Sequence, residues 1–258
     1  MILIKPSIDP IIFSIGILDI RWYSLAYIMG FILGSILIKK INKIYLNKLS
    51  NRQIDNFFVW SILGVIIGGR LGYVVFYQIN SFLLNPIYVL KVWEGGMSFH
   101  GGLIGIIVSI YFFCKKNKLE FFYLSDLISI AAPIGLFFGR IANFINAELY
   151  GRITTLPFAI VYPEIDSLPR HPSQIYEALL EGILILIILL VYFYKSNFKP
   201  SIGKISAIFL ISYSIFRILA EFLREPDSHI GLIFNLISMG QLLSLPLLIF
   251  GIVIYKQK

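Results

Sequence analysis

The 258-residue chain is poor in charge, in acidic residues and in cysteine. Only 14% of its residues are charged, 58% are hydrophobic, and the mean hydropathy is +0.84, values that exclude an ordinary soluble domain of this length. The single cysteine, Cys114, excludes an intrachain disulfide and a cysteine-rich metal site. The three histidines are far apart in the sequence, and neither a His-Glu-x-x-His helix nor an Asp-rich pair occurs, so no metal or other cofactor is expected.

Seven apolar runs occupy most of the chain, and most of them have about the 20 residues that a helix needs to cross a roughly 30 Å hydrocarbon core. We therefore predict an all-α integral membrane protein with seven transmembrane helices, built as a single domain over residues 1–258. The third run is the shortest and is expected to be tilted or partly re-entrant. The spans are predicted at residues 17–38, 54–77, 99–113, 124–144, 172–194, 201–222 and 236–255.

Lys and Arg residues are unevenly shared between the two sides of these spans, with 13 in one set of alternate loops and 6 in the other. Because cytoplasmic loops carry the positive excess, the N-terminus is predicted outside and the C-terminus in the cytoplasm. The longest external loop, residues 146–171, contains three prolines and short β-like pieces, and we expect it to form a small extracytoplasmic cap. The net charge of +8 comes with no basic cluster that has interleaved aromatic residues, so no nucleic-acid partner is expected.

Polar side chains within the predicted spans collect at the outer ends of the spans. Three arginines, Arg70, Arg140 and Arg217, lie inside three different spans near that side. An Arg at the membrane centre costs roughly 2.5 to 3.5 kcal/mol on insertion scales, so these side chains are expected to be paired or functional. Any one of them could snorkel to the interface as an anchor, but three at one depth favour a functional site.

Arg217 and Glu221 are four residues apart and therefore lie on one helical face. A buried structural ion pair is the plain interpretation of these two residues. If Arg140 lies at the same place, net positive charge remains, and the planar guanidinium fork suits a phosphate. Since the site opens on the outer leaflet, the anion expected there is a phospholipid headgroup.

His100 begins the third predicted span and is followed by Gly101, Gly102 and Gly105. A histidine at the end of a span is often a hydrogen-bonded structural residue, but the neighbouring glycine face lets a substrate come close, which favours a catalytic role. In the second span the stripe Gly64, Gly68 and Gly72 predicts close helix packing.

Together these residues form segments that identify a family. The chain closely resembles the bacterial prolipoprotein diacylglyceryl transferases, and the matching segments run from the first predicted span to the last. The segments are R-W-Y-S-L-A-Y from Arg21, G-G-R-L-G-Y from Gly68, G-G-M-S-F-H-G-G-L-I-G from Gly95, G-R-I-A-N-F-I-N-A-E-L-Y-G-R from Gly139, R-H-P-S-Q-I-Y-E-A from Arg170, F-R-I-L-A-E-F-L-R-E-P-D from Phe216 and S-M-G-Q-L-L-S-L-P from Ser238. Two mild departures are Ala147 and Tyr150, where the family often has Gly and Trp.

The resemblance implies a transferase of the bacterial inner (cytoplasmic) membrane that starts lipoprotein maturation. Such an enzyme moves the diacylglyceryl group of phosphatidylglycerol to the thiol of the lipobox cysteine in a preprolipoprotein signal peptide, forming a thioether and releasing glycerol phosphate. A cysteine attacks as thiolate and has a pKa of about 8.5, so a base near neutrality is expected. The resemblance implies His100 as base with Tyr23 as helper, Arg140 and Arg217 as stabilisers of the leaving oxygen, Arg70 as a further substrate-binding residue, Asn143 as a neutral donor, Gly151 as a point of close backbone access, and Glu148 and Glu221 as residues that orient the arginines.

Three other classes of protein compete with this interpretation. A transporter or channel for an anionic lipid or solute should carry polar groups along the whole path and often shows inverted repeats, whereas this chain has a one-sided site and no repeat. An enzyme that transfers phospholipid headgroups should carry an Asp-Gly-rich metal-binding signature, and no Asp-Gly pair occurs. A purely structural membrane subunit leaves the outer-leaflet arginines unexplained.

Overall fold

The computed structural model describes residues 3–15, 18–226, 231 and 236–258. These residues fall into two compact units, which are considered separately. The first unit comprises Met1–Tyr45 and Asp126–Lys258, and the second comprises Leu46–Ser125. Helices dominate both units, as the sequence predicts.

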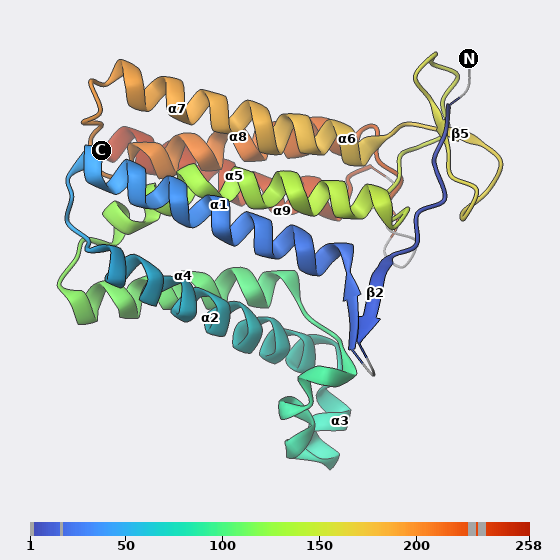
Figure 1. Cartoon of the computed structure of the whole chain (residues 1–258), viewed down its shortest axis with the longest axis horizontal. Helices are drawn as coiled ribbons and strands as arrows, with labels where there is room; N and C mark the ends of the chain where they lie inside the picture. The colour runs from blue at the N-terminus through green and yellow to red at the C-terminus, as the bar shows by residue number, and fades with distance from the viewer. Residues whose placement is uncertain (1–2, 16–17, 227–230, 232–235) are drawn as a thin grey trace. The chain divides into compact units, whose positions relative to one another are not determined.

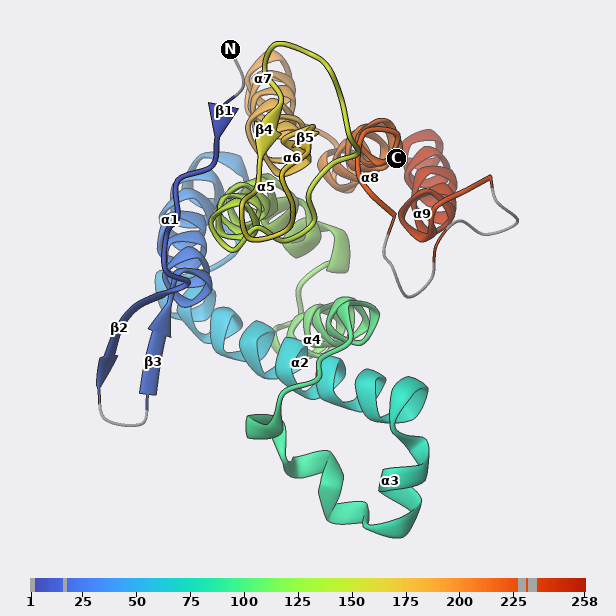
Figure 2. The same cartoon turned by 90° about the vertical axis from the view of Figure 1, so that its right-hand side faces the viewer.

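The first unit is a group of long apolar helices that run roughly alongside one another (Figure 1) and are seen nearly end-on in Figure 2. Two of them, α8 and α9, pack directly against each other. The helices are α1 (Trp22–Tyr45), α5 (Phe121–Ile145), the continuous run of α6 (Ser173–Glu177), η3 (Ala178–Leu184) and α7 (Ile185–Lys195), then α8 (Lys204–Glu221) and α9 (Met239–Gln257).

Polar side chains fix where two of these helices begin. The carboxylate of Asp126 on α5 accepts the backbone N–H of Gly203 at 2.7 Å and that of Ser206 at 2.8 Å, so it satisfies two free donors at the start of α8. Ser238 and Gln241 form a capping box at the start of α9. These contacts fix the N-terminal ends of α8 and α9.

The second unit consists of two long helices and a short helical connection between them. The long helix α2 begins with a capping box formed by Ser50 and Gln53. The elements in order are α2 (Asn51–Tyr77), α3 (Ile79–Leu84), η1 (Pro86–Leu90), η2 (Val92–Glu94) and α4 (Phe99–Asn117).

Glycines hold α2 and α4 close together. A methyl group added at Gly64 would lie 2.6 Å from the carbonyl oxygen of Gly105, and one added at Gly72 would lie 2.8 Å from the Cα atom of Gly101. Neither distance leaves room for a side chain. The packing role predicted for the stripe of small residues on α2 is therefore confirmed.

Short strands cover one end of the first unit. The N-terminal strand β1 (Leu3–Ile4) pairs in parallel with β4 (Ile160–Val161), which pairs in turn with β5 (Pro169–Arg170). Strands of the segment 146–171 thus form a small sheet with β1, a pairing that the sequence did not predict, and this region is called the cap below. A separate hairpin, β2 (Ile11–Ile15) and β3 (Leu18–Arg21), leads directly into α1.

Helices occupy all seven predicted segments, and α1, α2, α5, the run from α6 to α7, and α9 are long and apolar enough to cross a membrane. The chain is thus a mainly α-helical, multi-pass membrane protein, while the count of seven spans remains a prediction. The prediction that the first span begins at residue 17 is wrong, because Leu18–Arg21 pairs as a strand and the helix begins at Trp22. Helix α4, which occupies the third predicted span, extends to Asn117, beyond the predicted end at residue 113.

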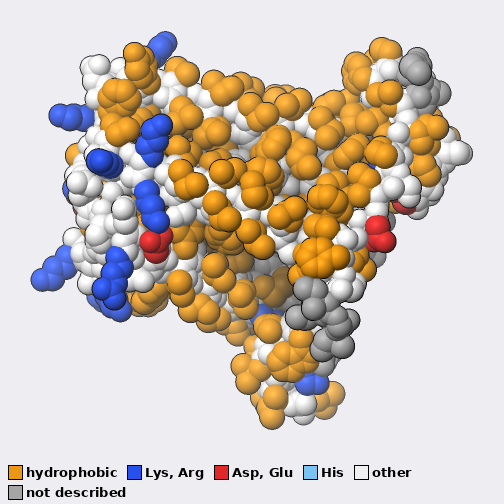
Figure 3. All heavy atoms as spheres, in the orientation of Figure 1, with side chains coloured by type: hydrophobic (Ala, Val, Ile, Leu, Met, Phe, Trp, Pro, Cys, Tyr) orange, Lys and Arg blue, Asp and Glu red, His pale blue; other side chains and the backbone are white. Residues whose placement is uncertain are grey.

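Hydrophobic side chains cover the visible sides of the helices in Figure 3. Large hydrophobic side chains are also exposed on α9, where Ile249 and Phe250 are 63% and 56% exposed. In the first unit the Lys and Arg side chains in this view gather at the helix ends where α1 ends and the chain terminates. Exposed apolar flanks with basic ends are typical of helices surrounded by lipid.

Candidate active site

Three helical segments of the first unit bring two arginines and a glutamate together. Arg140 lies on α5, Glu177 is the last residue of α6, and Arg217 lies on α8. One carboxylate oxygen, Oε2 of Glu177, lies 2.8 Å from Nη2 of Arg140 and 2.6 Å from Nη1 of Arg217. Glu177 therefore bridges the two guanidiniums.

Two more glutamates complete this charged cluster. Arg140 donates to Oε2 of Glu181 from Nη2 at 3.0 Å and from Nε at 3.3 Å, while Nη1 of Arg217 lies 3.6 Å from Oε1 of Glu181. Nη2 of Arg217 donates to Glu221, as the spacing of these two residues predicts, and Nη1 of Arg224 lies 3.7 Å from the same carboxylate. The expected excess of positive charge around Arg140 and Arg217 is not found, because three carboxylates face them.

The cluster is deeply buried. The side chains of Glu177 and Glu181 are 0% exposed, and those of Arg140 and Arg217 are 15% and 11% exposed. Burial removes these charges from water, which is costly unless every group has partners. Yet Oε1 of Glu177 and Oε1 of Glu181 have no hydrogen-bond partner among the described residues.

The two buried glutamates stand where the helix is irregular. Glu177 ends α6, and Glu181 lies within η3, a π-helical turn in an otherwise α-helical segment. Gly182 in the same turn packs against Phe137 of α5, since an added methyl group would lie 2.7 Å from the Cβ atom of Phe137. Single π-helical turns inside α-helices occur frequently at functional sites, and this one positions both glutamates toward Arg140.

A second polar group joins the start of α1 to the end of α5. The hydroxyl of Tyr23 donates to Oε2 of Glu148 at 2.5 Å, and Nδ2 of Asn143 donates to Tyr23 and also to Glu148, at 3.3 Å. Glu148 therefore holds Tyr23 and Asn143 together, and its predicted role in orienting an arginine stays a prediction. The turn that carries it includes Ala147 with φ of 55°, a left-handed conformation that glycine adopts more easily.

Close packing explains Gly151. Its backbone N–H donates to the carbonyl oxygen of His171 at 3.0 Å, and a methyl group added at Gly151 would lie 2.8 Å from the carbonyl oxygen of Leu223. The space beside this glycine is filled by the chain itself. These contacts support a structural role for Gly151, and its predicted role in substrate binding stays a prediction.

Arg70 holds a loop of the second unit. It donates to the carbonyl oxygens of Tyr88 at 2.8 Å, Val89 at 3.2 Å and Gly95 at 2.5 Å, and its guanidinium lies 4.8 Å from the centre of the Tyr88 ring. The side chain is almost fully buried. These contacts support a structural role for Arg70 in the connection between α2 and α4 and do not support its predicted contact with substrate.

His100 lies in the first turn of α4, in the second unit. The preceding Ser98 caps this helix by accepting the backbone N–H of Gly101 at 3.2 Å. The side chain of His100 lies outside the described part of the structure. Its predicted role as a base therefore stays a prediction.

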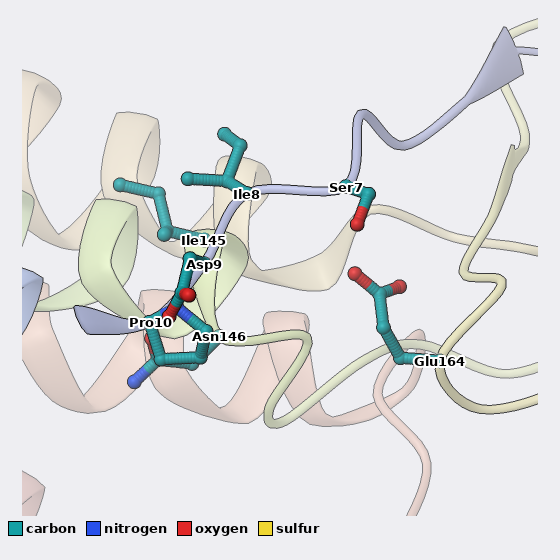
Figure 4. A pocket seen from close by; sticks show the side chains of 7 residues that line it. All are labelled: Ser7, Ile8, Asp9, Pro10, Ile145, Asn146 and Glu164. Carbon is teal, nitrogen blue, oxygen red and sulfur yellow. The ribbon is translucent and has the colours of Figure 1, made fainter. Parts of the chain in front are cut away.

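The part of the chain that the structure describes contains no candidate metal site at the charged cluster. No group of three His, Cys, Asp or Glu side chains there could hold a metal ion. An open hollow of about 470 Å³ lies between the N-terminal segment, the end of α5 and the cap (Figure 4). None of the arginines or glutamates of the cluster lines it, and we assign it no role; its lining is Ser7, Ile8, Asp9, Pro10, Ile145, Asn146 and Glu164.

Comparison with known proteins shows the family of the chain. A family model described as prolipoprotein diacylglyceryl transferase matches residues 10–256, which is nearly the whole chain. The chain belongs to the prolipoprotein diacylglyceryl transferase family. Within this family it is 49% identical over 247 residues to a protein of Rickettsia bellii (strain OSU 85-389), covering 96% of this chain and 94% of the relative. It is also 50% identical over 249 residues to a protein of Rickettsia typhi, covering 96% of both chains. Both relatives are named phosphatidylglycerol–prolipoprotein diacylglyceryl transferase.

In this member of the family, two functional candidates, Glu177 and Glu181, were not predicted from the sequence. The sequence did contain a signal for them. Glu177 and Glu181 are four residues apart in the very apolar segment Ser173–Lys195, so they lie on one helical face and need cationic partners.

Proposed function

We propose that this chain transfers the diacylglyceryl group of phosphatidylglycerol to a prolipoprotein, the first step of lipoprotein maturation. The acceptor is the thiol of the lipobox cysteine in the signal peptide. Its thiolate attacks the glycerol carbon that carries the phosphate, a C–S bond forms as the C–O bond breaks, and glycerol phosphate leaves with the electrons of that bond. The match over residues 10–256 and the names of the relatives support this reaction.

The observation that carries the proposal is the meeting of Arg140 and Arg217, which come from two helices and share Glu177. The reaction displaces a phosphate ester, so negative charge grows on the leaving oxygen. Two guanidiniums with fixed directions can hold a phosphodiester and stabilise that charge. The attacking cysteine belongs to the substrate, and the chain's own Cys114 is buried and takes no part.

The remaining site residues have supporting roles in this proposal. Tyr23 and Asn143, held together by Glu148, contribute neutral donors beside the headgroup. Glu221 orients Arg217. His100 is proposed as the base that removes the thiol proton, on the strength of the family resemblance and its place at the start of α4.

The proposal also includes a membrane topology. The chain crosses the bacterial inner membrane seven times, with the N-terminus outside and the C-terminus in the cytoplasm. The excess of Lys and Arg in the loops assigned to the cytoplasm supports this orientation. It places the charged cluster near the outer leaflet, on the side where the cap folds.

Transfer can be tested with the purified full-length protein. It is incubated in detergent with phosphatidylglycerol and a synthetic lipobox peptide, and the mass of the peptide is measured. We expect the peptide mass to rise by the diacylglyceryl group, and a matched peptide with serine in place of the lipobox cysteine to stay unmodified. Phosphatidylglycerol that is bound or moved across vesicles without any change in peptide mass would contradict the proposal and favour a lipid transporter.

A further inference from the structure

The donors that a phosphate headgroup needs are occupied by carboxylates in this structure. Oε2 of Glu177 accepts from both Arg140 and Arg217, and Oε2 of Glu181 accepts twice from Arg140. If the proposed function holds, a phosphodiester oxygen must take over some of these hydrogen bonds. Headgroup and glutamates therefore compete for the same guanidinium donors.

Binding of the headgroup is electrostatically unfavourable if no residue of the cluster changes its protonation state. Three guanidiniums, those of Arg140, Arg217 and Arg224, lie among the carboxylates of Glu177, Glu181 and Glu221. This set is already neutral before any lipid binds. A bound phosphodiester adds one negative charge to a buried site, and an uncompensated buried charge is strongly disfavoured.

Two oxygen atoms of the cluster can accept a proton without losing a hydrogen bond, and the one contact affected is that of Oε1 of Glu181 with Nη1 of Arg217, at 3.6 Å. Oε1 of Glu177 and Oε1 of Glu181 are buried and have no hydrogen-bond partner among the described residues. Protonation at this oxygen leaves the contacts of Oε2 with the guanidiniums in place, so it is the position at which each carboxylate loses least. Once protonated, this oxygen becomes a hydrogen-bond donor. A phosphodiester oxygen of the bound headgroup can then act as its acceptor.

We infer that Glu177 and Glu181 together take up one proton when the phosphodiester headgroup binds at Arg140 and Arg217. The proton comes from water on binding, and it is released when the phosphate product leaves. Uptake keeps the buried cluster neutral and frees guanidinium donors for the headgroup. The two glutamates thus tune the affinity of the site for an anionic lipid.

Charged and titratable side chains from two helices surround Glu177 and Glu181. Arg140 faces the pair from α5, and Arg217 and Tyr213 face it from α8. Glu221 pairs with Arg217, and Arg224, which follows that helix, lies near Glu221. Glu181 has the longer contacts to both arginines, so its replacement by Gln should disturb the cluster least. Gln has nearly the same shape, carries no charge and needs no proton to release a guanidinium.

The experiment counts protons during binding, without any lipoprotein present. A short-chain, ether-linked phosphatidylglycerol is titrated into the purified full-length protein by calorimetry, in buffers of different ionisation enthalpy. We expect one proton taken up per lipid bound, and a Kd that rises as the pH rises, because binding consumes a proton. Glu181→Gln should bind with no proton uptake and with a nearly pH-independent Kd. The control Glu164→Gln, in the exposed cap, should behave like the wild type.

A second measurement on the wild type identifies the group that is protonated. Because the ether-linked lipid has no ester carbonyl, an infrared difference spectrum should show the carbonyl band of a newly protonated carboxylic acid on binding. No proton uptake, or uptake without that band, would overturn the inference while leaving the transfer reaction intact. Uptake that persists in both Glu181→Gln and Glu177→Gln would overturn it as well. Failure of the wild type to bind the lipid at any pH would overturn the headgroup site of the proposed function and this inference with it.

Discussion

Replacing Arg217 by Lys separates a phosphate-binding role from a structural one. Arg217 uses two different nitrogen atoms, Nη1 toward Glu177 and Nη2 toward Glu221. A lysine ammonium keeps the charge but is a single point, so it cannot span both carboxylates or hold a phosphodiester in the same geometry. The substitution therefore removes at least one directed donor.

The size of the effect follows from that lost donor. Removing one preorganised donor to a developing oxyanion typically costs about 10²- to 10³-fold in rate, or roughly 2.7 to 4 kcal/mol. We expect Arg217→Lys to insert and accumulate normally and to transfer the diacylglyceryl group at a rate reduced by about that factor. The assay measures the initial rate of peptide modification at saturating phosphatidylglycerol.

Two comparisons make the result interpretable. Arg170→Lys is the matched control, because Arg170 also spans two acidic side chains, Asp166 and Glu225, but lies in the cap. It should retain nearly full activity. Near wild-type turnover of Arg217→Lys would refute the phosphate-clamp reasoning. The second comparison is Glu221→Gln. If this variant fails to accumulate in the membrane while the protein that does accumulate turns over normally, the Arg217–Glu221 pair holds the helices together, and the catalytic assignment of Arg217 would have to be withdrawn.

Four further outcomes are expected. A reporter fused after Lys258 should be active only in the cytoplasm, and activity outside would reverse the topology. A chelator should leave the transfer rate unchanged, whereas a loss that a divalent ion restores would favour a metal-dependent headgroup transferase. Gly68→Val should destabilise the packing of α2 on α4 by about 1 to 3 kcal/mol, measured as a lower Tm, whereas Gly135→Ala, which has open space, should not. The hydrogen bond from Arg170 holds the pKa of Asp166 below the ordinary aspartate value, so this contact stabilises the cap at neutral pH and is lost as the pH falls through that lowered pKa. Asp166→Asn should therefore speed hydrogen exchange in β5 at pH 7, and the difference from the wild type should disappear in strong acid; equal exchange at pH 7 would contradict it.

The sequence predicted the helices well because each depends on a local property. Long apolar runs must form helices in lipid, since no water is available to satisfy their backbone groups. The close packing of the glycine stripe that contains Gly64 could also be predicted, because small residues at every fourth position create a flat helix face. The strand β3 was missed because Leu18 and Ile20 were joined to the apolar run that follows them. Only the pairing with β2 shows that Leu18–Arg21 is extended.

Long-range pairing limited the rest of the prediction. The strand β1 gains its partner β4 from a segment more than 150 residues away, and nothing in Leu3–Ile4 alone indicates that pairing. The site shows the same limit. The arginines stood out because charge is rare in the spans, but their distribution among Glu177, Glu181 and Glu221 depends on how α5, η3 and α8 pack.

The most direct test of the proposed transfer follows two parts of one lipid. Phosphatidylglycerol labelled with deuterium in its diacylglyceryl group and with radioactive phosphorus in its headgroup is incubated with the purified protein and a lipobox peptide. The account predicts that deuterium appears on the peptide cysteine as a thioether, while the radioactive phosphorus appears in equal amount as water-soluble glycerol phosphate. Radioactive phosphorus on the peptide, or release of glycerol phosphate with no deuterium on the cysteine, would contradict it.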